Sequence, residues 1–86
     1  MRSMPDKKRV LSLPTLDRLF RLANVPEYDL DAQLALAEVL EECALEILDI
    51  SMELLHHANR KTMKDDDLGL AYETWLKNLR KEQAHP

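Results

Sequence analysis

Glycine, proline, cysteine and aromatic residues are all scarce in this sequence. Its 86 residues include one glycine and four prolines, and the stretch from Leu30 to His85 has no proline and only Gly69. Because glycine and proline interrupt helices most strongly, this composition predicts an all-α protein. The length allows one small domain and excludes a second, catalytic one. The single cysteine, Cys43, excludes an internal disulfide and fits a reducing compartment.

Long apolar runs are absent as well. No stretch approaches the roughly 18 apolar residues that a membrane span needs, and the basic start is not followed by the apolar core of a signal peptide. We therefore expect a soluble, cytoplasmic protein without a membrane partner. We find no cluster of nucleophile, base and orienting acid, and His56 and His57 point about 100° apart on a helix without a third ligand at suitable spacing. The sequence thus predicts no enzyme, no small-molecule substrate, no cofactor and no metal.

Basic side chains are missing from the middle of the chain. Residues 22–59 carry nine acidic and no basic side chains, whereas residues 1–21 have a net charge of +4 and residues 60–86 a net charge of +1. The total of −4 argues against nucleic acid as a partner. Segregation weakens this argument, because a binding surface responds to local charge rather than to the sum.

The apolar spacing predicts a short first helix. Residues 1–11 have little apolar periodicity and are expected to form a mobile basic arm. A helix over about 13–23 follows, with Ser12 as its N-cap and a proline tolerated in its first turn. We expect the folded domain to cover 12–82 and a short tail to cover 83–86.

A long second helix is predicted over about 30–58. Pro26 breaks the chain before it, and Asp29 supplies its N-cap. At 1.5 Å per residue the helix is about 43 Å long, which exceeds the width of a domain of this size. We expect a second copy to cover its apolar surface in a two-fold homodimer. The side expected to face solvent is marked by Glu38, Glu41, Glu42, Glu46, Asp49 and Glu53.

A third, medium-length helix is predicted after a short link. Asn59 is suited to a left-handed helix end, and Thr62 and Asp65 have the spacing of a capping box, so the helix is expected to start at Met63. Tyr72 and Trp75 are expected to be core or bundle contacts rather than platforms for stacked bases.

The stretch Asp31-Ala-Gln-Leu-Ala-Leu-Ala-Glu-Val-Leu-Glu-Glu42, the stretch His57-Ala-Asn-Arg-Lys-Thr62 and Asp67 together resemble the minimal archaeal-type histones. The resemblance runs from about Leu13 to Lys77. It implies a histone fold in which two chains interlock as an obligate handshake homodimer. It also implies a prokaryotic histone that binds duplex DNA through phosphates without base readout and organises the chromosome.

By position, the resemblance assigns DNA contact to two regions, the first helix and the second loop. Arg60 is implied to brace the loop by pairing with Asp67, while the Lys61 side chain and the Thr62 amide meet phosphate. From the residues alone, exposed helix arginines without a role and a well-capped turn remain open alternatives. With the basic arm included, the expected DNA-binding residues are Lys7, Lys8, Arg9, Arg18, Arg21, Arg60, Lys61 and Thr62.

Two further features concern assembly and partner choice. Leu54, His57 and Asp67 match the positions at which family members join dimer to dimer, which implies a tetramer or a longer stack. Glu27 stands in the first loop where the family usually has an arginine, and its carboxylate repels phosphate. The alternative function is therefore an acidic histone-fold dimerisation module that docks protein partners, with DNA contact weak or lost.

Overall fold

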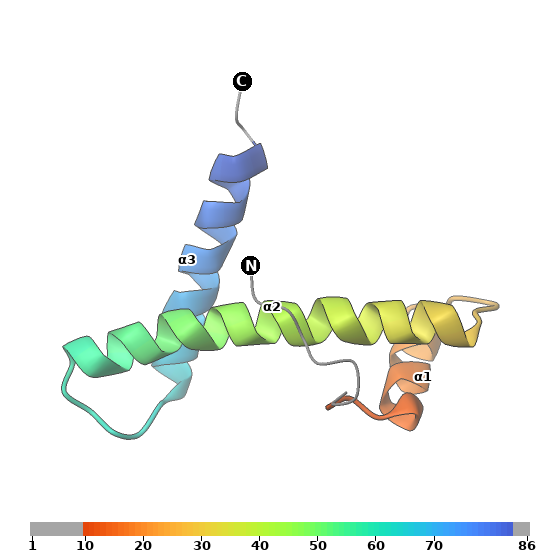
Figure 1. Ribbon diagram of the computed structural model, residues 1–86, viewed down its shortest axis with the longest axis horizontal. Coiled ribbons are helices and arrows are strands. Elements are labelled where there is room, and N and C mark those ends of the chain that lie inside the picture. The colour runs from red at the N-terminus through yellow and green to blue at the C-terminus, as the bar shows by residue number, and fades with distance from the viewer. Residues whose placement is uncertain (1–9, 84–86) are drawn as a thin grey trace. The chain divides into compact units, whose positions relative to one another are not determined.

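The computed structural model describes residues 10–83 and has three helices joined by two short loops within that range (Figure 1). The helices are α1 (Leu13–Leu22), α2 (Leu30–His57) and α3 (Asp65–Gln83). The described part contains no strand, so the predicted all-α class is confirmed. The chain divides within α2 into two compact units, one ending at Cys43 and the other starting at Ala44. None of the described helices is long and apolar enough to cross a membrane.

Local capping sets both ends of α1. The Ser12 hydroxyl accepts a hydrogen bond from the Thr15 amide at 3.3 Å, as its predicted N-cap role requires. At the other end, Asn24 has a positive φ of 61°, and the Val25 amide reaches back to the Phe20 carbonyl at 3.0 Å. This is a Schellman cap, in which a left-handed residue satisfies the last carbonyls of the helix. α1 therefore stops where the first loop begins.

α2 begins at its predicted cap. The Asp29 carboxylate accepts the Ala32 amide at 2.9 Å, which satisfies one of the four N–H groups that a helix start leaves unpaired. The helix then continues for 28 residues, which corresponds to about 42 Å. The predicted length of this helix is thus confirmed to within one residue.

α3 begins two residues later than predicted, so the proposed capping box of Thr62 with Asp65 is wrong. The N-cap is Lys64, whose carbonyl accepts the Asp67 amide at 3.0 Å. In return, the Asp67 carboxylate accepts the Lys64 amide at 2.9 Å. Both Asp65 and Asp67 have a side chain suited to closing a box, and the partner that Asp67 finds in Arg60 selects the later register.

Few side chains are buried within the protomer. In the unit that ends at Cys43, the buried side chains are those of Leu16, Ala37 and Glu41, and in the second unit they are those of Ser51, Leu55, Asp67 and Ala71. The expectation that Glu41 faces solvent is therefore wrong. The helical period places it beside the other acidic residues, but a partner distant in sequence draws its carboxylate inward.

Large apolar side chains remain exposed along all three helices. Val39 is 56% exposed and Leu70 is 53% exposed, although both lie well inside their helices. A soluble monomer rarely leaves so much contiguous apolar surface in water. The exposed apolar side chains within the helices are Leu19, Leu22, Leu30, Leu34, Val39, Leu48, Met52, Leu68, Leu70, Tyr72 and Leu79.

An indole hydrogen bond joins α3 to the second half of α2. Trp75 is half-buried, and its Nε1 donates to Glu46 Oε1 at 2.8 Å. The ring of Tyr72 stacks beside it at a centroid distance of 6.2 Å. Trp75 is thus a packing contact within the unit, which supports the interpretation of these rings as structural.

Candidate nucleic-acid interface

The second loop starts from a sharply defined helix end. Asn59 has a positive φ of 53°, and the Arg60 amide donates to the Leu55 carbonyl at 3.1 Å. The Asn59 amide donates to the His56 carbonyl, also at 3.1 Å. This is the same Schellman arrangement that ends α1. Both loops are therefore entered through an asparagine that tolerates the left-handed conformation.

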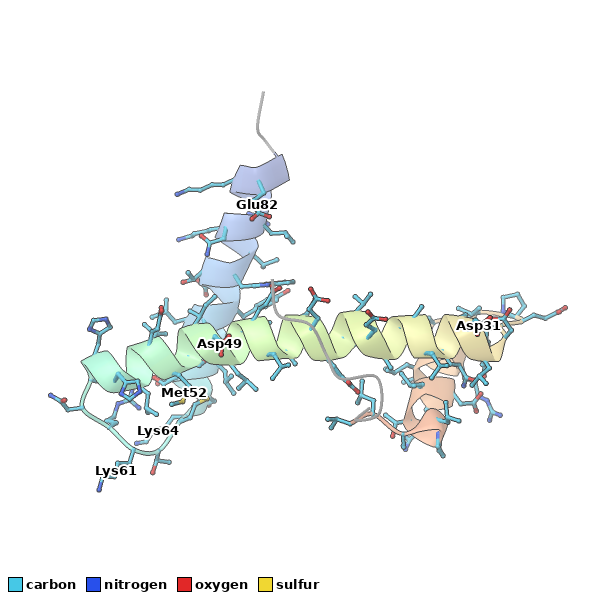
Figure 2. All side chains as sticks on the ribbon, in the orientation of Figure 1. Asp31, Asp49, Met52, Lys61, Lys64 and Glu82 are labelled. Atoms are coloured by element: carbon cyan, nitrogen blue, oxygen red, sulfur yellow. The ribbon has the colours of Figure 1, made fainter. Side chains whose placement is uncertain are left out.

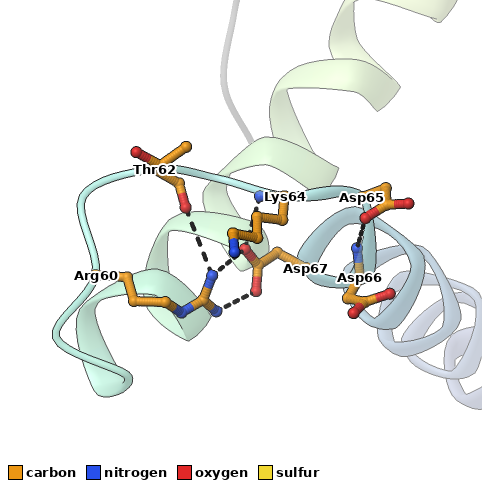
Figure 3. A network of polar contacts seen from close by, with 6 residues as sticks. All are labelled: Arg60, Thr62, Lys64, Asp65, Asp66 and Asp67. Atoms are coloured by element: carbon orange, nitrogen blue, oxygen red, sulfur yellow. Dashed lines mark hydrogen bonds and ion pairs between the residues drawn. The ribbon is translucent and has the colours of Figure 1, made fainter.

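An ion pair closes the second loop (Figure 3). Arg60 Nη1 donates to Asp67 Oδ2 at 2.9 Å, and Nη2 donates to Oδ1 at 2.5 Å. Two parallel N–H bonds make a bidentate pair, the strongest geometry between these groups. Arg60 Nη1 also lies 3.5 Å from the Thr62 carbonyl oxygen. The guanidinium thus contacts the middle of the loop as well as the first turn of α3.

The ion pair changes the acidity of its members. The Arg60 hydrogen bond, followed by that of the Lys64 amide, lowers the pKa of Asp67 from 3.8 to about 2. The same contact raises the pKa of Arg60. Asp67 is only 6% exposed, and its carboxylate is charged under all ordinary conditions. The pair therefore braces a loop of fixed shape.

Lys61 and Thr62 are exposed within this braced loop. Figure 2 shows Lys61 at the outer edge of the loop, with its amine directed away from the helices. Lys64, near the start of α3, is exposed as well. The loop therefore presents ammonium groups to solvent while its arginine is engaged internally.

The first helix offers two exposed cations with different surroundings. Arg18 and Arg21 are both exposed on α1. Arg21 Nη2 pairs with the carboxylate of Asp17 at 3.0 Å, one turn earlier. The Tyr28 hydroxyl donates to the same carboxylate from the first loop, and its ring stacks on Phe20 with centroids 4.4 Å apart. The first loop is thus folded back onto α1.

Glu27 lies beside this contact and is exposed. Its carboxylate adds negative charge to the loop surface, where a phosphate-binding site needs positive charge. Asp29, which follows Tyr28, is engaged as the N-cap of α2. The first loop is therefore less suited to phosphate than the second.

A third contact was missed by sequence analysis. The buried carboxylate of Glu41 accepts hydrogen bonds from the amides of Val10 and Leu11, at 2.8 and 2.7 Å. No local pattern signals it, because the partners are 31 and 30 residues apart. The predicted DNA-binding residues Lys7, Lys8 and Arg9 directly precede these amides and lie outside the described residues.

The residues expected at a dimer-to-dimer contact differ in exposure. Leu54 is half-buried and His57, the last residue of α2, is exposed. The structure brings Asp67 to Arg60 and Lys64 rather than to His57. Within residues 10–83, no group of three or more His, Cys, Asp or Glu side chains is arranged to hold a metal ion.

The comparison with known proteins agrees with this arrangement. A family model described as histone-like transcription factor (CBF/NF-Y) and archaeal histone matches residues 11–72. The chain belongs to this histone family. The archaeal histone HAN1 of Thermococcus zilligii is 44% identical over 61 residues, which cover 71% of this chain and 91% of that protein. The histone family is one of DNA-binding chromatin proteins and not of enzymes.

The match to this histone-family model ends at Tyr72, within α3, although the helix continues to Gln83. The continuation carries three exposed basic side chains, Lys77, Arg80 and Lys81. The extended third helix expected from the sequence is thus present as regular helix.

Proposed function

We propose that this histone-family chain binds duplex DNA through its phosphates, without reading base sequence, and so compacts or organises the chromosome. The observation that carries the proposal is the braced second loop. Its arginine is held by Asp67, which leaves the Lys61 amine and the exposed Thr62 backbone directed outward. Phosphates are bound by such amines and by backbone amides near helix starts, and these contacts carry no base information.

The binding unit that we propose is an obligate homodimer. Large apolar side chains are exposed along the helices of one protomer, and a second copy covers them most simply by a two-fold pairing. The family's handshake pairing places the first loop of one chain beside the second loop of the other. In that pairing Arg18 and Arg21 join Lys61 and Thr62 on one phosphate-binding surface at each end of the dimer.

Tetramers or longer stacks would form from such dimers through Leu54 and His57. Asp67 is buried against Arg60, so its carboxylate serves the loop first. A histidine reaching it from another dimer would add to an existing ion pair rather than make a new one. We place the assembled protein in the cytoplasm, on the chromosome.

Duplex binding by Lys61→Glu tests the proposal. The variant should bind two unrelated duplexes of equal length more weakly than the wild type and to the same extent, because it loses a phosphate contact and not a base contact. A paired Arg18→Ala and Arg21→Ala change should behave alike. Lys81→Glu is the matched control, since it makes the same charge change on α3. Equal losses for Lys61→Glu and Lys81→Glu would show that overall charge, and not this loop, governs binding.

A protein-docking module is the second candidate function. The observation that favours it is Glu27, exposed in the first loop of a chain with a net charge of −4. Under the DNA proposal, Glu27→Arg should strengthen duplex binding, because it replaces repulsion by attraction at the surface shared with Lys61. Unchanged, undetectable binding for both the wild type and this variant at low salt would favour the docking module.

A further inference from the structure

An anchor on α2 holds the segment that precedes α1. Both amides of that segment, from Val10 and Leu11, donate to the same carboxylate oxygen, Glu41 Oε2, at 2.8 and 2.7 Å. The contact closes a chain segment that includes all of α1 and the first loop. It lies outside the second loop, on which the proposed phosphate site is built.

Burial makes this carboxylate informative. Glu41 is 8% exposed, and an acidic side chain is rarely buried unless it is paired or hydrogen-bonded, because loss of water disfavours its charge. Hydrogen bonds to an ionised acceptor are roughly twice as strong as neutral ones. The two amides offset the desolvation, so the segment that Glu41 holds accounts for its inward position.

The anchored segment connects two groups of cations. Lys7, Lys8 and Arg9 immediately precede Val10 in the sequence, outside the described residues. Because consecutive Cα atoms are 3.8 Å apart, Lys7 stays within about 11 Å of Val10 whatever path the chain takes. In the other direction, the segment leads through Ser12 directly into α1, which bears Arg18 and Arg21.

We propose that Glu41 is a positioning residue for DNA binding, whose hydrogen bonds to Val10 and Leu11 keep the basic triplet Lys7, Lys8 and Arg9 beside α1. The triplet then contacts the same duplex as α1. This inference rests on the proposed DNA-binding function. It runs against simple electrostatics, because removal of a carboxylate from a protein that binds a polyanion should strengthen binding. Loss of the anchor predicts weaker binding instead.

Glu41→Gln and Glu41→Met form a matched pair for the test. Both remove the same charge and keep a similar side-chain size, but only glutamine retains an oxygen that accepts the two amides. The measurement is the slope of log association constant against log salt concentration for a duplex. We expect Glu41→Gln to keep the wild-type slope and Glu41→Met to reduce its magnitude by up to about 2.7 per arm, at about 0.9 for each of three phosphate contacts.

Two further variants separate the anchor from general damage. Val10→Pro leaves Glu41 in place and removes one donated N–H, so it should also reduce the slope and it replaces Glu41→Met if that variant does not fold. Glu42→Gln removes a charge one residue away and should not reduce the slope. In a background with Lys7, Lys8 and Arg9 all changed to Gln, Glu41→Met and Glu41→Gln should have equal slopes.

Hydrogen exchange at Val10 and Leu11 measures the anchor without DNA. Both amides should exchange faster in Glu41→Met than in Glu41→Gln, with the helix content of the two variants equal by circular dichroism. Equal slopes for the two Glu41 variants, beside a salt-dependent wild type, would overturn the positioning role alone. A wild type that shows no salt-dependent binding would overturn the DNA function, and the role of Glu41 in it, even with the exchange difference present.

Discussion

Single carboxylates decide much of the behaviour of this chain, and three of them do so in different ways. Asp67 is held by Arg60 and braces the second loop, Glu41 is buried against backbone amides, and Glu27 stands exposed in the first loop. The Arg60 and Asp67 pairing was expected from the resemblance to histones. The Glu41 contact was not, because periodicity gives the face of a helix but not a partner 31 residues away.

Asp67→Asn should reveal the acid dependence of the brace. The pKa of Asp67 is lowered from 3.8 to about 2 in the fold, so the stabilisation is fully present above the ordinary value and is lost as the pH falls toward the lowered one. We expect the wild type to melt at a higher temperature than the variant at pH 7. This difference should begin to shrink below about pH 4. A difference in melting temperature that stays constant from pH 7 to pH 3 would contradict the ionised pair as its source.

At the scale of elements, the ends of the helices were the more predictable part. Ser12, Asp29 and Asn59 each act as their sequence context indicates, because caps are local and depend on a few neighbouring residues. The start of α3 was misplaced by two residues, since the competing choice of Asp67 depends on Arg60 across the loop. Sequence analysis thus locates elements well where local chemistry decides and less well where a tertiary contact does.

Asn59→Ala tests the left-handed helix end. Alanine lacks the local hydrogen bonding that lets asparagine occupy positive φ, so the variant should lose roughly 1 kcal/mol of unfolding free energy. Asn59→Gly should retain the stability of the wild type or exceed it slightly, because glycine adopts this conformation without steric cost. Urea unfolding at one protein concentration measures both. Equal stability of the alanine and glycine variants would contradict the assigned conformation.

For the whole molecule, the extent of exposed apolar surface argues that a single protomer is incomplete. Val39 and Leu70 are more than half exposed, and other large apolar side chains accompany them on each helix. Periodicity predicted that α2 would have apolar surface to spare, and its length predicted that one chain would not cover it. Sequence alone does not determine which side chains meet across the pair, because that depends on how two copies pack.

Thermal unfolding at several protein concentrations tests the homodimer. When folding and association are coupled, the midpoint rises with concentration, because mass action favours the associated state. We expect such a rise together with a dimeric or larger mass by light scattering. A midpoint independent of concentration and a monomeric mass would contradict an obligate dimer.

The salt dependence of duplex binding by the wild-type chain tests the central claim most directly. If Arg18, Arg21 and Lys61 of two protomers each neutralise one phosphate, the association constant should fall with salt on a log-log slope of about −5, and more steeply with the basic arm engaged. Duplexes of unrelated sequence should give the same slope. A flat salt response, or no binding at low salt, would contradict phosphate binding by this surface.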